Sequence, residues 1–296
     1  MLTVEAILLF QVLYLCFYKT LFSIFLKEFA PHPLLNHLVS SYRIVHYGDA
    51  PLFHQPWTVS PTGYNTLTIL LAPASVVDID RNENMNARIR YSGQLDAVRY
   101  FVSDVRLNAA IFVDLKPGAG YELLGIPQHD FTNRWQELDT FLPNYSEFYN
   151  RLDDYYPNID QMLSVLDNWL LEMALSSKSR VRSELNFALQ LINETNGLID
   201  IVQLRDKVGM ARASFQNYFK EQVGVSPKMY SRIVRANAMY KQLNQTATKD
   251  WQQIISDFEY FDQAHFIKDF KHFFGSAPSQ LFQQNQSNND FRHYLE

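Results

Sequence analysis

Two short stretches of this chain mix aromatic side chains with side chains that donate and accept hydrogen bonds. One is ARASFQNYFKEQVGVSP, residues 211–227, and the other is FDQAHFIKDFKHFFGSAP, residues 261–278. Both contain the pattern F-K-x-x-x-G-x-x-P, offset by 51 residues, and residues before it correspond as well. The corresponding pairs are Phe215 with Phe266, Leu204 with Ile254, and Val208 with Phe258. Such a repeat indicates two copies of one structural unit.

Each copy is predicted to be a helix, a turn and a second helix. In the first copy, Leu204 lies on the buried face of a short helix that Gly209 ends, because glycine takes a positive φ without steric cost. The second helix spans about residues 212–223. Its inward residues at i, i+3, i+4 spacing are Phe215, Tyr218 and Phe219. In the second copy the inward residues are Phe266, Ile267 and Phe270.

The opposite faces of the two second helices carry side chains that suit the edges of bases and the phosphates of DNA. Gln and Asn pair with adenine, Arg and Lys with guanine or phosphate, and small Ala accommodates a thymine methyl. These outward or flanking residues are Arg212, Ala213, Gln216, Asn217 and Lys220 in the first copy, and Gln263, Ala264, His265, Lys268 and Lys271 in the second. The hypothesis is therefore a pair of helices that read the major groove. The alternative is a helical bundle with solvated polar faces.

The region 199–282 resembles the DNA-binding domain of the AraC/XylS family of bacterial transcription regulators. GVSPKMYSRIVRANAM resembles the segment that links the two helix-turn-helix units of that family, and FDQAHFIKDFKHFFGSAPSQLF resembles its signature over the second unit. The resemblance implies a long connecting helix over about 227–243, which would hold the reading helices about one turn of DNA apart. It also implies RNA polymerase as a partner. Carried over, it assigns phosphate contacts to Arg212, Lys220 and Lys271 and base contacts to the other outward residues.

Two residues depart from the family pattern. Glu259 stands in the second turn, where the family usually has glycine. Ala211 stands where the first reading helix usually begins with a capping serine, and the loss of such a cap costs about 1 kcal/mol.

The front half is predicted to be a β-rich domain, a sandwich or barrel. Between residues 28 and 142, short runs rich in Val, Ile, Tyr, Phe, Leu and Thr are separated by Pro and Gly. Three segments resemble, in order, the N-terminal domain of one group of AraC-type regulators, which implies a sensor or dimerisation module. These segments are FLKEFAPHPLLNHLVSSYRIVHY, TVSPTGYNTLTILLAP and DLKPGAGYELLGIPQHDFTN.

Helical periodicity begins near residue 144. IDQMLSVLDNWLLEMAL predicts one helix, and a second over about 181–193 is expected to end near Gly197. The apolar face of the first helix, with Met162, Leu166, Trp169 and Leu170, suits either a core or a dimer seam.

Charge is divided unevenly along the chain. The whole chain carries −5, whereas residues 196–284 carry 11 Lys and Arg against 8 Asp and Glu, a net charge of +3. The mildly basic part thus coincides with the repeat, as a nucleic-acid contact requires.

The apolar run 6–26 has one charge, Lys19, and is long enough to span a bilayer. A charge near the bilayer centre costs about 2.5–3.5 kcal/mol, which counts against an anchor. A buried helix and a start site placed too far upstream are the other interpretations, and the resemblance, whose start falls near KEFAPHPLL, favours the last.

No motif of an enzyme, cofactor or metal site is found. G-x-S-x-G, the P-loop and G-x-G-x-x-G are absent, and the single Cys16 excludes an intramolecular disulfide and favours the cytoplasm. The front histidines lack ligand spacing, and the acids near Asp78 are interpreted as a solvated loop. We therefore predict no catalytic residue, no metal and no cofactor.

The sequence predicts an α+β protein, a β-rich domain followed by an all-α domain with two helix-turn-helix units. The predicted divisions are an apolar segment 1–27, a sensor or dimerisation domain 28–143, a helical linker 144–195, a DNA-binding domain 196–284 and a polar tail 285–296. The predicted function is a DNA-binding transcription regulator that binds double-stranded DNA, with a small-molecule effector and a homodimer as further candidates. The competing hypothesis is a small-molecule-binding β-domain whose helical tail is a platform for protein interactions.

Overall fold

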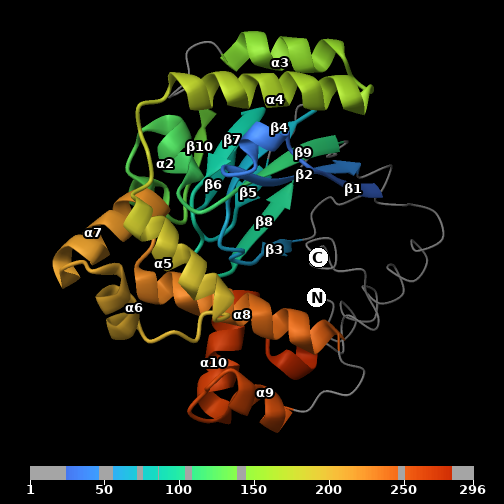
Figure 1. Cartoon of the computed structure of the whole chain (residues 1–296). Coiled ribbons are helices and arrows are strands. Elements are labelled where there is room, and N and C mark those ends of the chain that lie inside the picture. Colours follow the sequence, from blue (N-terminus) through green and yellow to red (C-terminus); the bar gives the residue numbers. More distant parts are fainter. Residues whose placement is uncertain are drawn as a thin grey trace, which may run out of the picture.

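The computed structural model places a β-rich half beside a helical half (Figure 1). It describes residues 25–46, 56–71, 76–85, 87–103, 109–138, 145–245 and 251–281. Residues 6–24 of the apolar run and the predicted polar tail 285–296 lie outside these ranges. Within them, none of the helices combines the length and the apolarity that a membrane crossing needs.

The front half consists of two antiparallel sheets. The larger has the strand order β1-β2-β9-β4-β7-β10 and the smaller β3-β8-β5-β6. The strands are β1 Phe25–Phe29, β2 Val39–His46, β3 Trp57–Val59, β4 Asn65–Leu70, β5 Val76–Asp78, β6 Glu83–Met85, β7 Ile89–Ser92, β8 Arg99–Ser103, β9 Ala109–Leu115 and β10 Trp135–Glu137. The β-rich domain followed by helices confirms the predicted fold class.

The run AAIFVDL forms the central strand β9 because each of its faces meets a different apolar layer. Side chains alternate between the faces of a strand. Ile111, Val113 and Leu115 belong to the larger core beneath α4, whereas Ala110 belongs to a smaller cluster with Phe101 on the other sheet. Burial on both faces explains why the sequence of β9 is almost wholly apolar.

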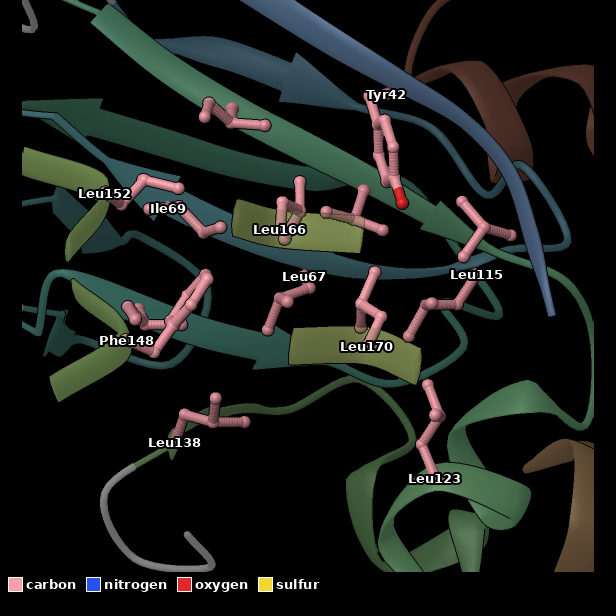
Figure 2. Close-up of a cluster of buried hydrophobic side chains, with 14 of the residues drawn as sticks. Tyr42, Leu67, Ile69, Leu115, Leu123, Leu138, Phe148, Leu152, Leu166 and Leu170 are labelled. Atoms are coloured by element: carbon pink, nitrogen blue, oxygen red, sulfur yellow. The ribbon is translucent and has the colours of Figure 1, made fainter. Parts of the chain in front are cut away.

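Two helices cover the outer face of the larger sheet, α3 Tyr145–Asp154 and α4 Ile159–Ser176 (Figures 1 and 2). The hydroxyl of Tyr42 donates a hydrogen bond of 2.6 Å to the Asp167 carboxylate and so joins β2 to α4. The apolar face of α4 is core and not a dimer seam. Its residues are the buried Met162, Leu166 and Leu170, with Trp169 stacked on Phe148.

The helical half contains two separate cores, one for each copy of the repeat. The first contains α5 Ser183–Glu194, α6 Ile201–Val208 and α7 Arg212–Val223. The second contains α9 Trp251–Asp257 and α10 Gln263–Phe274. The helix α8, Pro227–Gln245, contributes Tyr230 to the first core and Ile233 through Leu243 to the second. A single continuous helix therefore connects the two copies.

Short helices complete the front half, and two of them lie next to the first copy. These are η1 Pro33–Leu35, α2 Ala119–Leu124 and η2 Gln128–Phe131. The Pro-Gly turn predicted after β9 leads into α2, and α2 and η2 both contact α7.

Candidate DNA-binding interface

The first helix-turn-helix unit consists of α6 and α7, joined by a glycine-containing turn. The Asp200 carboxylate caps α6 by accepting hydrogen bonds from the backbone N–H groups of Val202 and Gln203, at 2.9 and 3.0 Å. Gly209 ends α6 with a φ of 71°, as predicted. Ala211 is the N-cap of α7 and makes no side-chain cap bond, which the sequence also predicts.

The helix α7 separates an aromatic inner face from a polar outer face. The buried rings of Phe215 and Phe219 lie edge to face with centroids 5.8 Å apart. Tyr218 is half-buried, with the guanidinium of Arg182 over its ring at 3.9 Å. Of the predicted reading residues, Gln216 is half-buried and the other four are exposed: Arg212, Ala213, Asn217 and Lys220. Their spacing of one, three or four residues places them on one side of the helix.

The second unit repeats this arrangement with α9 and α10. Asp262 caps α10 because its carboxylate accepts a hydrogen bond from the backbone N–H of His265, at 2.7 Å. The inner face is fully buried at Phe266 and Phe270, and Ile267 is half-buried. All five predicted reading residues are exposed: Gln263, Ala264, His265, Lys268 and Lys271. The structure thus brings each predicted set together on the outer side of one helix.

The second turn contains a residue in the left-handed region. Glu259 has a φ of 51°, at the position where the resemblance leads us to expect glycine. A side chain in this conformation costs roughly 1–2 kcal/mol. The glutamate that the sequence shows at this position therefore strains the backbone of the turn, and the helix-turn-helix unit still folds around it.

A buried carboxylate, which the sequence reasoning missed, holds the second reading helix against α8. Asp269 is 4% exposed and accepts hydrogen bonds from Arg232 at 2.7 Å and from Arg235 at 3.2 Å. Burial raises the pKa of Asp269, but the hydrogen bond from Arg232 and the charges of both arginines outweigh it, so the pKa lies below its ordinary value. The available signal was an acid inside the buried stripe formed by Phe266, Phe270 and Phe273.

Both units also contact the front domain. The hydroxyl of Thr132, just after η2, donates a 2.6 Å hydrogen bond to the carbonyl of Gly224 at the end of α7. Asn237 of α8 donates to the carbonyl of Pro61, at 3.0 Å. The contact with α10 centres on His272, a residue to which the sequence gave no role.

His272 joins α10 to the segment that leads into β8. Its Nε2 lies 2.7 Å from the carbonyl oxygen of Asp96, so Nε2 carries the proton because a carbonyl can only accept. The backbone N–H of Val98 donates to the carbonyl of His272, at 3.0 Å. Tyr100 lies on β8 itself, and its hydroxyl lies close to Gly275 just past α10.

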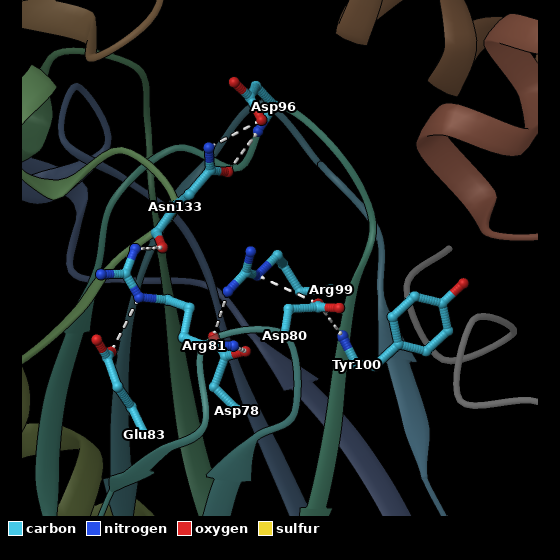
Figure 3. Close-up of polar contacts among 8 residues, drawn as sticks. All are labelled: Asp78, Asp80, Arg81, Glu83, Asp96, Arg99, Tyr100 and Asn133. Carbon is cyan, nitrogen blue, oxygen red and sulfur yellow. Dashed lines mark hydrogen bonds and ion pairs between the residues drawn. The ribbon is translucent and has the colours of Figure 1, made fainter.

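A polar network holds residues 96–98, which contact α10, in place (Figure 3). The Asn133 side chain donates to the Asp96 carboxylate at 2.8 Å and accepts from the Asp96 N–H at 3.1 Å. Arg99 pairs with the fully buried Asp78 at 2.7 Å. The prediction of a solvated acidic loop is therefore wrong for Asp78, because its side chain is buried. The charge of Arg99 compensates for the loss of water around this carboxylate.

The outer faces of α7 and α10 carry lysines that no group in the described part of the chain neutralises. Within the described residues, no hydrogen bond or ion pair engages the side chains of Lys220, Lys268 or Lys271. Across the same ranges, no group of three or more His, Cys, Asp or Glu residues is arranged to hold a metal ion. The arrangement suits contact with an extended polyanion.

Comparisons with known proteins agree with this geometry in the helical half. A family model described as a helix-turn-helix domain matches residues 204–284. No curated protein matches the chain. Among solved structures, three crystal structures of ToxT from Vibrio cholerae are similar, each with 10% sequence identity.

The three ToxT structures differ in bound state and in coverage. An apo variant covers 88% of this chain and 97% of its own, with a TM-score of 0.46. A second covers 90% and 98%, with a TM-score of 0.43. A wild-type form with bound unsaturated fatty acid covers 77% and 91%, with a TM-score of 0.43.

The matched residues 204–284 include both reading helices and the helix α8 that joins them. They also include all ten residues that the sequence assigned to DNA contact. The C-terminal part of the chain is a helix-turn-helix domain, as the sequence predicted.

Proposed function

We propose that α7 and α10 enter adjacent segments of one DNA major groove and read bases in both. The observation that carries this proposal is the pair of exposed polar faces, each supported by its own aromatic core and joined by one helix. Two reading helices that are fixed relative to each other favour one bipartite site over two independent ones.

The dimensions of α8 support two adjacent segments. The helix has 19 residues and is therefore about 28 Å long, at 1.5 Å per residue. One turn of DNA is about 34 Å, the distance that separates successive major-groove segments on one side of the duplex. The first unit packs on Tyr230 near the start of α8 and the second on Ile233 through Leu243, so this one helix fixes the two reading helices relative to each other.

The chemistry of each outward residue suggests its role. Gln216 and Asn217 in the first unit and Gln263 in the second suit adenine edges, and His265 and Lys268 suit guanine. The small Ala213 and Ala264 leave room for a thymine methyl. Three cations are assigned to phosphates: Arg212, Lys220 and Lys271.

We infer that the front domain controls the alignment of the two reading helices. It contacts the first unit through Thr132 and the second through His272 and Asp96. A change within the front domain that moves one contact relative to the other would alter the alignment of the two helices on DNA. We infer that this is how an effector or dimer formation acts on transcription.

The apolar cluster packed between the two sheets is the candidate location for a small-molecule effector. Trp57, Phe101 and Trp135 pack together there, with centroid distances of 6.1 and 5.0 Å from the central Phe101 ring. The buried indole N–H of Trp135 has no hydrogen-bond acceptor among the described residues. An acceptor atom of a ligand would satisfy that donor.

Regulation of this kind implies further partners and a compartment. RNA polymerase is the expected protein partner and a homodimer the expected assembly. The cytoplasm is the expected location because DNA and polymerase are there.

The salt dependence of DNA affinity tests the assignment of the lysines. Log affinity falls against log salt with a slope of about −0.9 for each neutralised phosphate. For the full-length protein on a random-sequence duplex, we expect Lys220→Ala and Lys271→Ala each to reduce the magnitude of the slope by about 0.9. Fluorescence anisotropy at several salt concentrations gives the slopes.

Lys178→Ala is the matched control, because Lys178 is also exposed but lies between α4 and α5. Its slope should equal that of the unaltered protein. Equal slopes for all three variants and the unaltered protein would contradict the assignment of phosphate contacts to Lys220 and Lys271.

A further inference from the structure

Phe261 is the most exposed large hydrophobic residue in the described part of the chain, at 91%. It lies in the turn between α9 and α10, directly before the capping residue Asp262. Its neighbours Phe258 and Tyr260 are 4% and 6% exposed. Only this one ring of the three points away from the core.

The ring of Phe261 is not required for packing the helix start. A hydrophobic residue before an N-cap usually packs on the fourth residue of the helix, which here is Phe266. Phe266 is 2% exposed and is surrounded by other rings. These are Trp251, Tyr260 and Phe270, with centroids at 6.1, 5.5 and 5.9 Å. Another set of side chains already covers Phe266, so packing does not account for an aromatic residue at 261.

The position of Phe261 is at the end of α10 that meets base edges. In helix-turn-helix proteins the first residues of the reading helix contact bases, and here these are Gln263, Ala264 and His265. The Asp262 carboxylate is engaged in the cap at 2.7 Å from the His265 nitrogen. Phe261 therefore adds a large apolar group beside these reading residues.

We propose that Phe261 is a specificity-determining residue that contacts the C5 methyl of a thymine at the edge of the second half-site. Among the groups in the major groove, the thymine methyl is the one that an apolar ring can bind favourably. This inference rests on the proposed function, because it needs α10 in the groove. It adds an apolar contact to the polar residues that the sequence assigned.

Substituting deoxyuridine for thymine tests the contact because it removes the methyl and nothing else. After selection of a binding site with the full-length protein, each thymine of the second half-site is replaced in turn. We expect one replacement to weaken binding of the unaltered protein about fourfold, the worth of one buried methyl group. Phe261→Ser should bind the thymine and the deoxyuridine duplexes equally.

Two further variants separate this contact from general effects. Phe261→Leu keeps an apolar side chain and should retain part of the sensitivity to the methyl. Phe187→Ser removes another exposed ring, 44% exposed on α5, and should leave the sensitivity unchanged.

The inference is overturned if no thymine of the second half-site shows methyl sensitivity, or if Phe261→Ser shows the same sensitivity as the parent. If Phe261→Ser binds no DNA, Phe261→Leu takes its place, and a methyl sensitivity equal to that of the parent in this variant overturns the inference. A failure of the proposed function gives a different result, since no site would be selected at all.

Discussion

Replacing Asp269 with alanine is expected to destabilise the second helix-turn-helix unit by about 3 kcal/mol, because breaking a buried ion pair leaves the remaining charges uncompensated. The side chain of Asp269 is 5% exposed, and its carboxylate binds two partly buried arginines, Arg232 and Arg235. Both arginines extend from α8 to α10, so the variant loses the connection that orients the second reading helix. Denaturant unfolding of the full chain measures the loss.

The matched control is Asp206→Ala, since Asp206 is exposed and pairs only with its neighbour Arg205 among the described residues. A surface pair of this kind contributes at most about 1 kcal/mol. Equal unfolding midpoints for the two variants would contradict the role assigned to Asp269.

The acid dependence of unfolding gives an independent check of the same ion pair. The pKa of Asp269 in the folded protein lies below its ordinary value of 3.8. The carboxylate therefore contributes its stabilisation at neutral pH, and this contribution is lost as the pH falls below about 3.8 and through the depressed folded value. Asp269→Asn, which cannot titrate, should show a shallower decline over that range than the unaltered protein.

Replacing Gly197 with alanine is expected to separate α5 from α8 and to cost more than about 3 kcal/mol. Gly197 has a φ of 74°, and its N–H donates to the carbonyl of Ile192 at 2.8 Å to end α5. An added Cβ would lie 2.1 Å from the backbone oxygen of Ser231 and 2.8 Å from the backbone nitrogen of Arg235. Backbone atoms inside α8 cannot move aside independently, so the whole helix must shift.

Gly209→Ala separates the clash from the backbone conformation. Gly209 has a similar φ of 71°, but nothing lies within 4 Å of an added Cβ. Its substitution should cost only the strain of the left-handed region, about 1–2 kcal/mol. Unfolding free energies from chemical denaturation compare the two, and equal losses would show that close approach to α8 does not matter.

The elements that local rules govern could be predicted from the sequence. The predicted bounds of the first reading helix, 212–223, are those of α7, because Gly209 ends the preceding helix and the Phe215 and Phe219 spacing defines the buried face. The second reading helix follows from the repeat. The missing cap at Ala211 and the strained turn at Glu259 were likewise visible as departures from a local pattern.

Features that depend on distant parts of the chain could not be predicted. Asp269 pairs with arginines more than thirty residues away, and only the orientation of α8 brings them together. His272 and Asp96 are 176 residues apart, so nothing in either segment indicates their contact. The strand order could not be predicted for the same reason. The strand β9 pairs with β2 and β4, which lie far from it in the sequence.

A pooled-oligonucleotide binding selection tests whether α7 and α10 read two adjacent major-groove segments of one site. It is performed with the unaltered protein and with Gln216→Ala and His265→Ala, whose side chains lie on α7 and α10. We expect one enriched motif that spans two adjacent major-groove segments. Gln216→Ala should relax the motif in one segment and His265→Ala in the other. Relaxation of the same positions by both variants, or no enrichment even at low salt, would contradict the claim that the two helices read adjacent segments.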